Sequence, residues 1–260
     1  MTTDQPQPAD EDKAHADIGL VSALAIELGP LLERCTRVKK YTGGKFTFRG
    51  GRYDEIRIAV VESGMGFAKA RRATEALIEA HTPNWVLSVG FSGGLLPKMK
   101  IGDMVLANSI VDTHGNELEL DLKMAEDREK GVYVGRFVNA DEIVRFVSDK
   151  KKFAEEYGAI AVDLESLAVA QVCRDQGKRF MAVRVISDDL SADLPAEVLS
   201  VIGATGALRV GSAIGSFFRR PSSIKDLWRL RETAHQAAER LATFLDGVLV
   251  QLHKSATESR

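Results

Sequence analysis

The chain has 260 residues, 35 of them basic and 37 acidic, and a formal net charge of −2 at neutral pH. This length suits one large α/β domain, and the lack of long blocks of one charge sign excludes an extended nucleic-acid-binding surface. The two cysteines, Cys35 and Cys173, lack the spacing of metal ligands, so we expect reduced thiols and no metal site. No cofactor is expected either.

Both ends of the chain are polar. Residues 1–17 are predicted to form a disordered leader rather than a signal peptide, and residues 254–260 a disordered tail. No run of 18 apolar residues occurs, so no transmembrane helix is predicted. These features together predict a cytoplasmic protein with a single domain over 18–253.

In the first third of the chain, strands and helices alternate. A strand is predicted at 18–24 and a helix at 28–34, followed by two antiparallel strands at 40–52 and 55–62. An amphipathic helix is predicted at 67–81, directly after a glycine turn. Four aromatic residues are expected to pack on one face of the antiparallel pair: Tyr41, Phe46, Phe48 and Tyr53.

The middle of the chain has the same alternating character. Strands are predicted at 85–89, 101–111 and 131–139. Residues 112–130 are too charged for a core and are expected to form a surface excursion. Residues 142–157 are expected to form a mostly exposed helix.

Two later apolar runs each end in a carboxylate. The runs 159–165 and 180–189 are separated by a helix-length segment, 166–177, and predict two buried parallel strands joined by a crossover helix. Open α/β sheets bind ligands at the carboxyl ends of their strands, and an unpaired buried charge is costly. Glu165 and Asp188 are therefore interpreted as functional; the alternative is that they only start a helix and cap a loop.

Two glycine-rich segments, 63–66 and 90–94, follow predicted strands. Backbone N–H groups in such turns can bind an anion or a ribose, although glycines at strand ends are more often simple turn residues. Neither segment has the spacing of a dinucleotide-binding loop or the Lys-Ser/Thr of a P-loop, which disfavours both functions.

Five segments carry a family resemblance, in this order along the chain: 18–27, 63–66, 90–95 with 102–103, 162–165, and 184–188. Together they resemble the nucleoside phosphorylase and nucleosidase superfamily, and most closely its branch containing methylthioadenosine/S-adenosylhomocysteine nucleosidase. The resemblance implies an α/β fold, a three-layer α/β/α sandwich around a mixed, partly closed sheet. It also implies a homodimer or higher homo-oligomer.

The resemblance implies cleavage of the N-glycosidic bond of a 5′-substituted adenosine, such as methylthioadenosine or S-adenosylhomocysteine. Breaking this bond develops positive charge on the ribose and negative charge on the base. Asp188 would protonate N7 of the purine, if partial burial lets it hold a proton near neutral pH. Glu165 would accept hydrogen bonds from the ribose 2′- and 3′-hydroxyls, and Glu27 would orient and deprotonate the attacking water.

Further substrate-binding positions are implied around these acids: Met65, Ser92, Gly93, Ile143, Val144, Leu164 and Ser187. For Met65 and Leu164, packing in the core is an equal alternative. Arg184, inside a strand, is expected to pair with a buried acid at least as readily as with substrate.

The residue types in the first strand–helix turn bear on the nucleophile. Family phosphorylases carry an arginine there to bind phosphate, whereas this chain has Ala25-Ile26-Glu27. A carboxylate repels phosphate, so hydrolysis is favoured. Phosphorolysis stays open through another arginine, such as Arg71 or one from a neighbouring subunit.

The chain departs from the nucleosidase pattern in two regions. Phe91 and Leu164 replace a small hydroxyl residue and a methionine, and the purine-stacking phenylalanine has no counterpart within 139–144. A helical segment is inserted at about 191–228, which resembles the hopanoid-associated phosphorylase-like enzymes that act on lipid-linked nucleosides. Its residues 213–221 are expected either to contact a membrane peripherally or to form a helical cover or dimer contact.

A catalytically inactive nucleoside-binding protein is the alternative from another functional class. The joint presence of Glu27, Glu165 and Asp188 argues against it, because a binding protein needs no acid beside the base.

Overall fold

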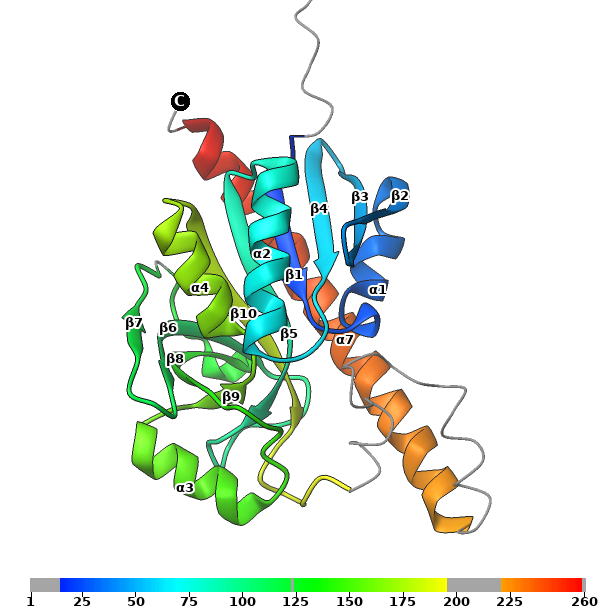
Figure 1. The fold of residues 1–260 in the computed structure, drawn as a ribbon. Helices are drawn as coiled ribbons and strands as arrows, with labels where there is room; N and C mark the ends of the chain where they lie inside the picture. Colours follow the sequence, from blue (N-terminus) through cyan, green and yellow to red (C-terminus); the bar gives the residue numbers. More distant parts are fainter. Residues whose placement is uncertain (1–14, 123, 196–220, 259–260) are drawn as a thin grey trace, which may run out of the picture.

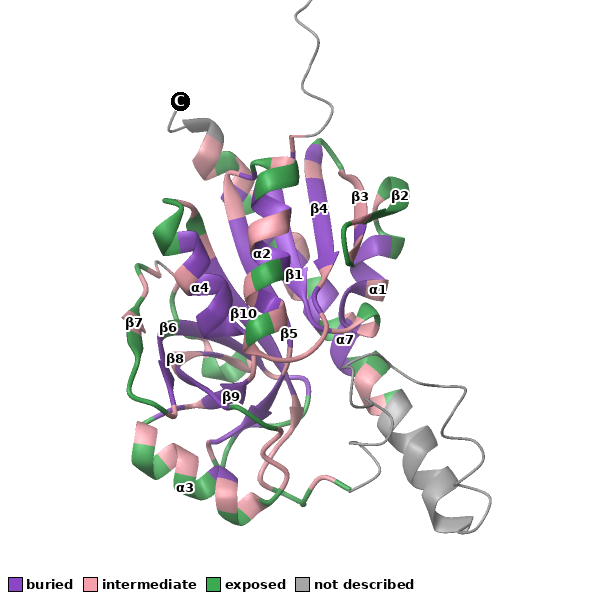
Figure 2. Cartoon of the chain, in the orientation of Figure 1, coloured by how far each residue is buried: buried purple, intermediate pink, exposed green. Residues whose placement is uncertain are grey.

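Two pairs of helices cover the two faces of one sheet (Figure 1). Helices α2 (Phe67–His81) and α4 (Ser166–Asp175) pack on one face, and α1 (Ala25–Glu33) and α7 (Pro221–Glu258) pack on the other. The strands between the two pairs are largely buried, as Figure 2 shows. The computed structural model describes residues 15–122, 124–195 and 221–258.

The centre of the sheet is parallel. Strands β4 (Ile56–Glu62), β1 (Ile18–Ser22), β5 (Trp85–Gly94) and β10 (Arg179–Asp188) are hydrogen-bonded in this order, and each runs parallel to its neighbour. Because parallel strands end at the same edge, the segments that follow β1, β4, β5 and β10 lie near one another.

The second half of the sheet closes into a ring. Strand β10 pairs antiparallel with β6 (Met104–Asp112), which is parallel to β8 (Val132–Asn139). Strand β9 (Ala161–Asp163) then joins β8 to the end of β5, to which it is antiparallel. The predicted three-layer sandwich around a mixed, partly closed sheet is thereby confirmed.

The two strands that were expected to be parallel, β9 and β10, run in opposite directions. Both pair with β5, but β10 runs parallel to it over Trp85 to Gly93, whereas β9 pairs antiparallel with Gly93 and Gly94. The glycines expected to form a turn at 90–94 therefore belong to the strand. A Cβ on Gly93 would lie 3.0 Å from Val162 Cγ1, so the missing side chain lets β9 approach at this point.

The region predicted as one strand at 40–52 is a hairpin of two strands. Strands β2 (Thr36–Gly43) and β3 (Phe46–Tyr53) are joined at Gly44, whose φ of +58° favours glycine. The aromatic residues do not share one face. Phe46 and Phe48 pack on the α2 side of the sheet, and Tyr53 packs on the opposite side.

The charged stretch after β6 is mostly a surface excursion, as expected, and it contains the short strand β7 (Glu117–Glu119) and the 3₁₀ turn η1 (Arg128–Lys130). Helix α3 (Val147–Tyr157) starts five residues later than predicted. Residues 142–146 are not helical, because Arg145 binds the Leu194 carbonyl and Asp193 accepts the Val147 N–H.

The predicted domain limits need correction at both ends. Ala16 and Asp17 belong to the fold, since their N–H groups donate to the carbonyls of His81 and Arg57. Helix α7 continues to Glu258, so the predicted tail at 254–260 is helical over most of its length. Most of the predicted insertion, including residues 213–220, lies outside the described residues. Within the described residues, no helix is long and apolar enough to cross a membrane.

Candidate active site

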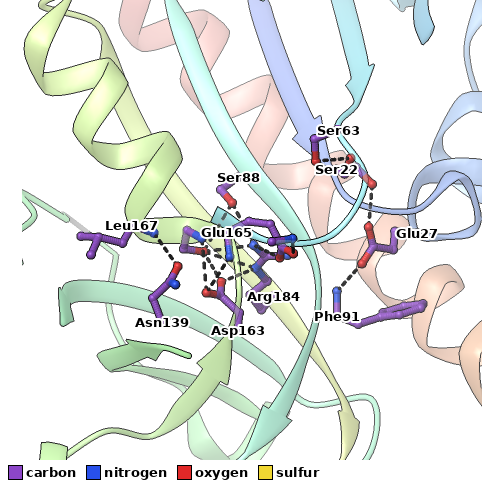
Figure 3. A network of polar contacts seen from close by, with 12 residues as sticks. Ser22, Glu27, Ser63, Ser88, Phe91, Asn139, Asp163, Glu165, Leu167 and Arg184 are labelled. Carbon is purple, nitrogen blue, oxygen red and sulfur yellow. Dashed lines mark hydrogen bonds and ion pairs between the residues drawn. The ribbon is translucent and has the colours of Figure 1, made fainter. Parts of the chain in front are cut away.

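The Glu27 side chain links the turn between β1 and α1 to the neighbouring strand β5 through hydrogen bonds. It lies in the first turn of α1 and is 3% exposed. Its Oε2 accepts hydrogen bonds from Ser22 Oγ (2.7 Å) and the Leu24 N–H (2.8 Å), and its Oε1 accepts the Phe91 N–H (3.0 Å) (Figure 3). A carboxylate has about four acceptor positions, so these three bonds leave one position for another donor, such as water.

Gly90 leaves room for the side chains of Glu27 and Arg184 beside β5. A Cβ at this position would lie 2.5 Å from Glu27 Oε1 and 2.6 Å from Arg184 Nη1. Any other residue here would displace one of the two side chains. The glycine-rich stretch therefore serves a close approach of charged groups rather than a turn.

Arg184 is the centre of a buried polar network (Figure 3). Its guanidinium is 1% exposed and forms ion pairs with Asp163 Oδ2 (2.8 Å) and Glu165 Oε2 (3.4 Å). It also donates to Ser88 Oγ at 3.0 Å and Ser166 Oγ at 3.2 Å. The expectation that Arg184 pairs with a buried acid is confirmed.

Asp163 orients the segment that presents Glu165. Its carboxylate accepts the Ser166 N–H at 3.2 Å and the Ser166 hydroxyl, at the start of α4. The Leu167 N–H donates to Asn139 Oδ1 at 3.3 Å, so β8 also helps to hold this helix N-terminus. Asp163 thus combines hydrogen bonds from Ser166, the first residue of α4, with an ion pair to Arg184.

Glu165 is 5% exposed and accepts the Gly66 N–H at 2.8 Å through Oε1. Burial raises the pKa of Glu165 to about 7, because removal from water disfavours the charged carboxylate. The carboxylates of Asp163 and Glu27 act in the same direction, whereas Arg184 and the Gly66 N–H oppose them. Glu165 therefore changes its charge near neutral pH.

This raised pKa predicts a loss of stability as the pH rises. The folded chain binds the Glu165 proton more tightly than the unfolded chain does, so the stabilisation is complete below about pH 4.5 and is lost through about pH 7. We expect the free energy of unfolding, measured in urea from pH 5 to 8, to fall by up to about 1.4 kcal/mol per pH unit from this group.

Glu165→Gln should remove this component of the slope, because the amide carries no charge at any of these pH values. The exposed Glu79→Gln on α2 is the matched control and should keep the slope. A slope that is unchanged in Glu165→Gln would contradict the assignment of this titration to Glu165.

Asp188 lies at the end of β10, beside Gly93 of β5. Its Oδ1 accepts the Ser187 hydroxyl at 2.7 Å, and its Oδ2 forms an ion pair with Lys150 of α3. Asp188 was expected to hold a proton through partial burial; the structure shows its carboxylate paired with the Lys150 ammonium.

The remaining predicted residues divide into three groups. Ser92 and Gly93 are buried in β5, and the Ser92 hydroxyl has no hydrogen-bond partner among the described residues. Val144 and Leu164 pack against one apolar cluster, which supports core packing for Leu164. Met65 and Ile143 are half-buried and take no part in the polar contacts described above.

Arg71, which could have bound phosphate in a phosphorolytic reaction, pairs with two acidic side chains instead. Its guanidinium lies 3.3 Å from Glu75 and 3.9 Å from Asp175, on the partly exposed surface of α2 and α4.

Sequence reasoning missed Lys150, which it placed in a mostly exposed helix. A signal was present: Phe146, Lys150, Phe153 and Tyr157 follow each other at spacings of four, three and four residues, which is one face of a helix. A lysine on an otherwise aromatic stripe indicates burial with a partner. No comparable sequence pattern indicated that the hydroxyls of Ser22, Ser88 and Ser166 take part in the buried polar contacts.

Comparisons with known proteins agree with this arrangement. The sequence profile described as "Phosphorylase superfamily" matches residues 17–121 and 117–250. The chain is 25% identical over 198 residues to a 5′-methylthioadenosine/S-adenosylhomocysteine nucleosidase of Staphylococcus haemolyticus, covering 66% of this chain and 86% of that protein. It is 27% identical over 224 residues to the nucleosidase of the same name from Marinomonas sp., covering 74% and 96%.

A solved structure shows the same fold. The crystal structure of 5′-methylthioadenosine/S-adenosylhomocysteine nucleosidase from Helicobacter pylori with butyl-thio-DADMe-Immucillin-A aligns with a TM-score of 0.66 and 22% identity, covering 90% of this chain and 99% of that one. The profile match extends over nearly the whole described fold, from β1 to α7. The chain therefore belongs to the phosphorylase superfamily.

Proposed function

We propose that this chain is a nucleosidase that hydrolyses the N-glycosidic bond of a purine nucleoside. The base would be adenine and the substrate a 5′-substituted adenosine, such as methylthioadenosine or S-adenosylhomocysteine. Support comes from the relatives named as nucleosidases of these two compounds and from three acids: Glu27 in the first turn of α1, Glu165 after β9 and Asp188 at the end of β10.

The sugar is bound by Glu165 in this proposal. Its carboxylate is oriented by Arg184 on one oxygen and by the Gly66 N–H on the other. Hydrogen bonds from the ribose 2′- and 3′-hydroxyls would become stronger as positive charge develops on the ribose, so they stabilise the transition state more than the substrate. Asp188 would protonate N7 and let the base leave as a neutral molecule.

The attacking water is positioned by Glu27. The carboxylate is held by three hydrogen bonds, from β1, from Leu24 just before α1 and from β5, and its remaining acceptor position can bind the water. As the water adds to C1′, its proton moves to Glu27. The rigid attachment to two strands and a helix aligns this acceptor before the reaction begins.

The charge of the buried network favours water over phosphate, and this is the observation that carries the hydrolytic assignment. Glu27, Asp163 and Glu165 surround the single guanidinium of Arg184, which is already engaged by two of these carboxylates. A phosphate dianion placed here would meet more negative than positive charge. Among the described residues, Arg71 offers no remedy, since it binds Glu75 and Asp175.

The proposal predicts the sugar product. With methylthioadenosine as substrate, we expect free adenine and free methylthioribose, whether or not phosphate is present, and the masses of the products distinguish them. A sugar 1-phosphate as the main product would show phosphorolysis instead. No release of base from any member of a panel of 5′-substituted adenosines would favour the inactive nucleoside-binding alternative.

Two parts of the proposal rest on family resemblance alone. We propose a homodimer or higher homo-oligomer on that basis. Action on a lipid-linked nucleoside, with a membrane contact through 213–221, concerns residues almost wholly outside the described part of the chain. An adenosine with a long apolar 5′-substituent in the same panel tests this second substrate class.

A further inference from the structure

Lys150 is a buried cation that helix stability does not explain. Its side chain is 0% exposed, whereas Lys151 and Lys152, which follow it in α3, are exposed. A positive charge in the first turn of a helix opposes the helix dipole, and a buried ammonium is costly unless it is paired. Its position therefore requires a partner elsewhere in the fold.

That partner is Asp188. The Lys150 Nζ contacts Asp188 Oδ2 in an ion pair and donates to the Asp189 carbonyl at 3.0 Å. A Cβ on Gly93 would lie 3.2 Å from Asp188 Oδ2 and 3.5 Å from Lys150 Cε, so the pair packs directly against the β5 backbone. The two residues form a unit at the position where the proposed mechanism needs an acid.

The polar groups around this unit have partners of their own among the described residues. Within that part of the chain, Asp188 Oδ1 accepts a neutral hydroxyl, from Ser187. The other charged groups on adjoining segments pair as follows: Asp149 with Lys152, Asp193 with the Val147 N–H, the Asp189 carboxylate with the Ser191 N–H, and Asp163 with Arg184. The ion pair that Lys150 forms is thus with Asp188, and the nearby Asp189 and Asp193 carboxylates accept backbone N–H groups.

An ammonium–carboxylate pair holds one transferable proton. It has the same composition as a neutral amine beside a carboxylic acid, so it can deliver an acid proton through the carboxyl group. An aspartic acid alone loses its proton at about pH 4, whereas a lysine keeps its proton to about pH 10. A pair therefore retains an acid proton at pH values where a lone aspartic acid would have lost it.

On the basis of the proposed function, we propose that Lys150 is a positioning residue that holds the catalytic proton at neutral and alkaline pH and passes it through Asp188 to the departing purine. As the C1′–N9 bond breaks, its electron pair moves into the base. Lys150 gives its proton to Asp188, and Asp188 passes this proton to N7, so the pair is left as a neutral amine beside a carboxylate. Water adds to C1′ and gives its proton to Glu27, and exchange with solvent restores both sites.

The test compares pH profiles of kcat/KM for adenine release from methylthioadenosine. Wild type should show no loss of activity between pH 7 and 9, because the pair still holds its proton. In Lys150→Met, Asp188 must hold the proton alone, so the ratio of variant to wild-type activity should fall about tenfold per pH unit from about pH 5 upward and recover toward one in acid. Because both proteins contain Glu165, any effect of its ionisation on kcat/KM cancels in the ratio of variant to wild type.

Two further variants separate the relay from other roles of the lysine. Lys150→Arg keeps the charge but does not release a proton, so it should be slow at neutral and alkaline pH, where Lys150→Met is slow as well. Lys151→Met removes an exposed lysine from the same run and should match wild type. Thermal unfolding of each variant at each pH verifies that the measured protein is folded.

Three results would overturn the inference. A variant-to-wild-type ratio that is independent of pH would show that Lys150 has only a structural role. Wild-type-like activity of Lys150→Arg would show that charge alone suffices. A fall in wild-type activity between pH 7 and 9 would contradict the inference without any variant. Failure of wild type to release base from any nucleoside would instead reject the proposed function and this inference with it.

Discussion

Asp188→Asn should lower kcat for adenine release by a factor on the order of 10² or more, as the loss of a general acid does. The amide cannot donate an acid proton to N7, and it also leaves the Lys150 ammonium without its counter-charge. The amide oxygen can still accept a hydrogen bond from Lys150, so we expect a folded protein with a lower melting temperature.

The measurement is the rate of adenine release at saturating methylthioadenosine, together with thermal unfolding of the same preparation. Asp175→Asn is the control, because Asp175 is an exposed carboxylate paired with Arg174 and should change neither quantity strongly. Turnover of Asp188→Asn within about threefold of wild type would remove Asp188 from the catalytic role.

Arg184→Met should reduce the free energy of unfolding by about 3–5 kcal/mol, the range observed when one partner of a buried ion pair is removed. The methionine fills much of the same volume but leaves the carboxylates of Asp163 and Glu165 buried without their cation. Ser88 would lose its guanidinium partner as well. Because whole domains are stable by only about 5–15 kcal/mol, this is a large share of the total.

Urea unfolding at pH 8 measures this effect, since Glu165 is then mostly ionised and the loss of Arg184 is most costly. At pH 5 the loss should be smaller, because Glu165 is protonated. Arg174→Met, on the exposed end of α4, should cost less than about 1 kcal/mol. If Arg184→Met does not fold, Arg184→Lys is measured instead. It keeps a positive charge at the site, so its loss in free energy of unfolding should lie between those expected for Arg174→Met and Arg184→Met. A loss below about 1 kcal/mol in Arg184→Met would contradict the role of the network in stability.

The buried network and the proposed chemistry place different demands on the same residues. Burial of Glu165 next to Asp163 and Glu27 raises its pKa to about 7 and destabilises the fold at alkaline pH. The same burial excludes water from a carboxylate that would bind the ribose, which strengthens its interaction with a cationic sugar. Stability is thus given up at the position where the proposed function needs a charged group out of water.

The sequence by itself determined the elements whose signals are local. Helix α2 was predicted with its observed limits, because apolar residues recur along it with the period of a helix and glycines precede it. The positions of Glu165 and Asp188 at strand ends were also predictable, since an apolar run followed by a carboxylate is visible in a few consecutive residues.

Only the tertiary structure decided how these pieces meet. The bonds that build the site join residues far apart in sequence: Phe91 to Glu27 spans 64 residues, Gly66 to Glu165 spans 99, and Lys150 to Asp188 spans 38. The direction of β9 relative to β10 likewise follows from closure of the sheet around β5, which no single strand encodes. Local patterns report which face of an element is buried, but the partner of a buried charge depends on which other element packs there, and that is a property of the whole fold.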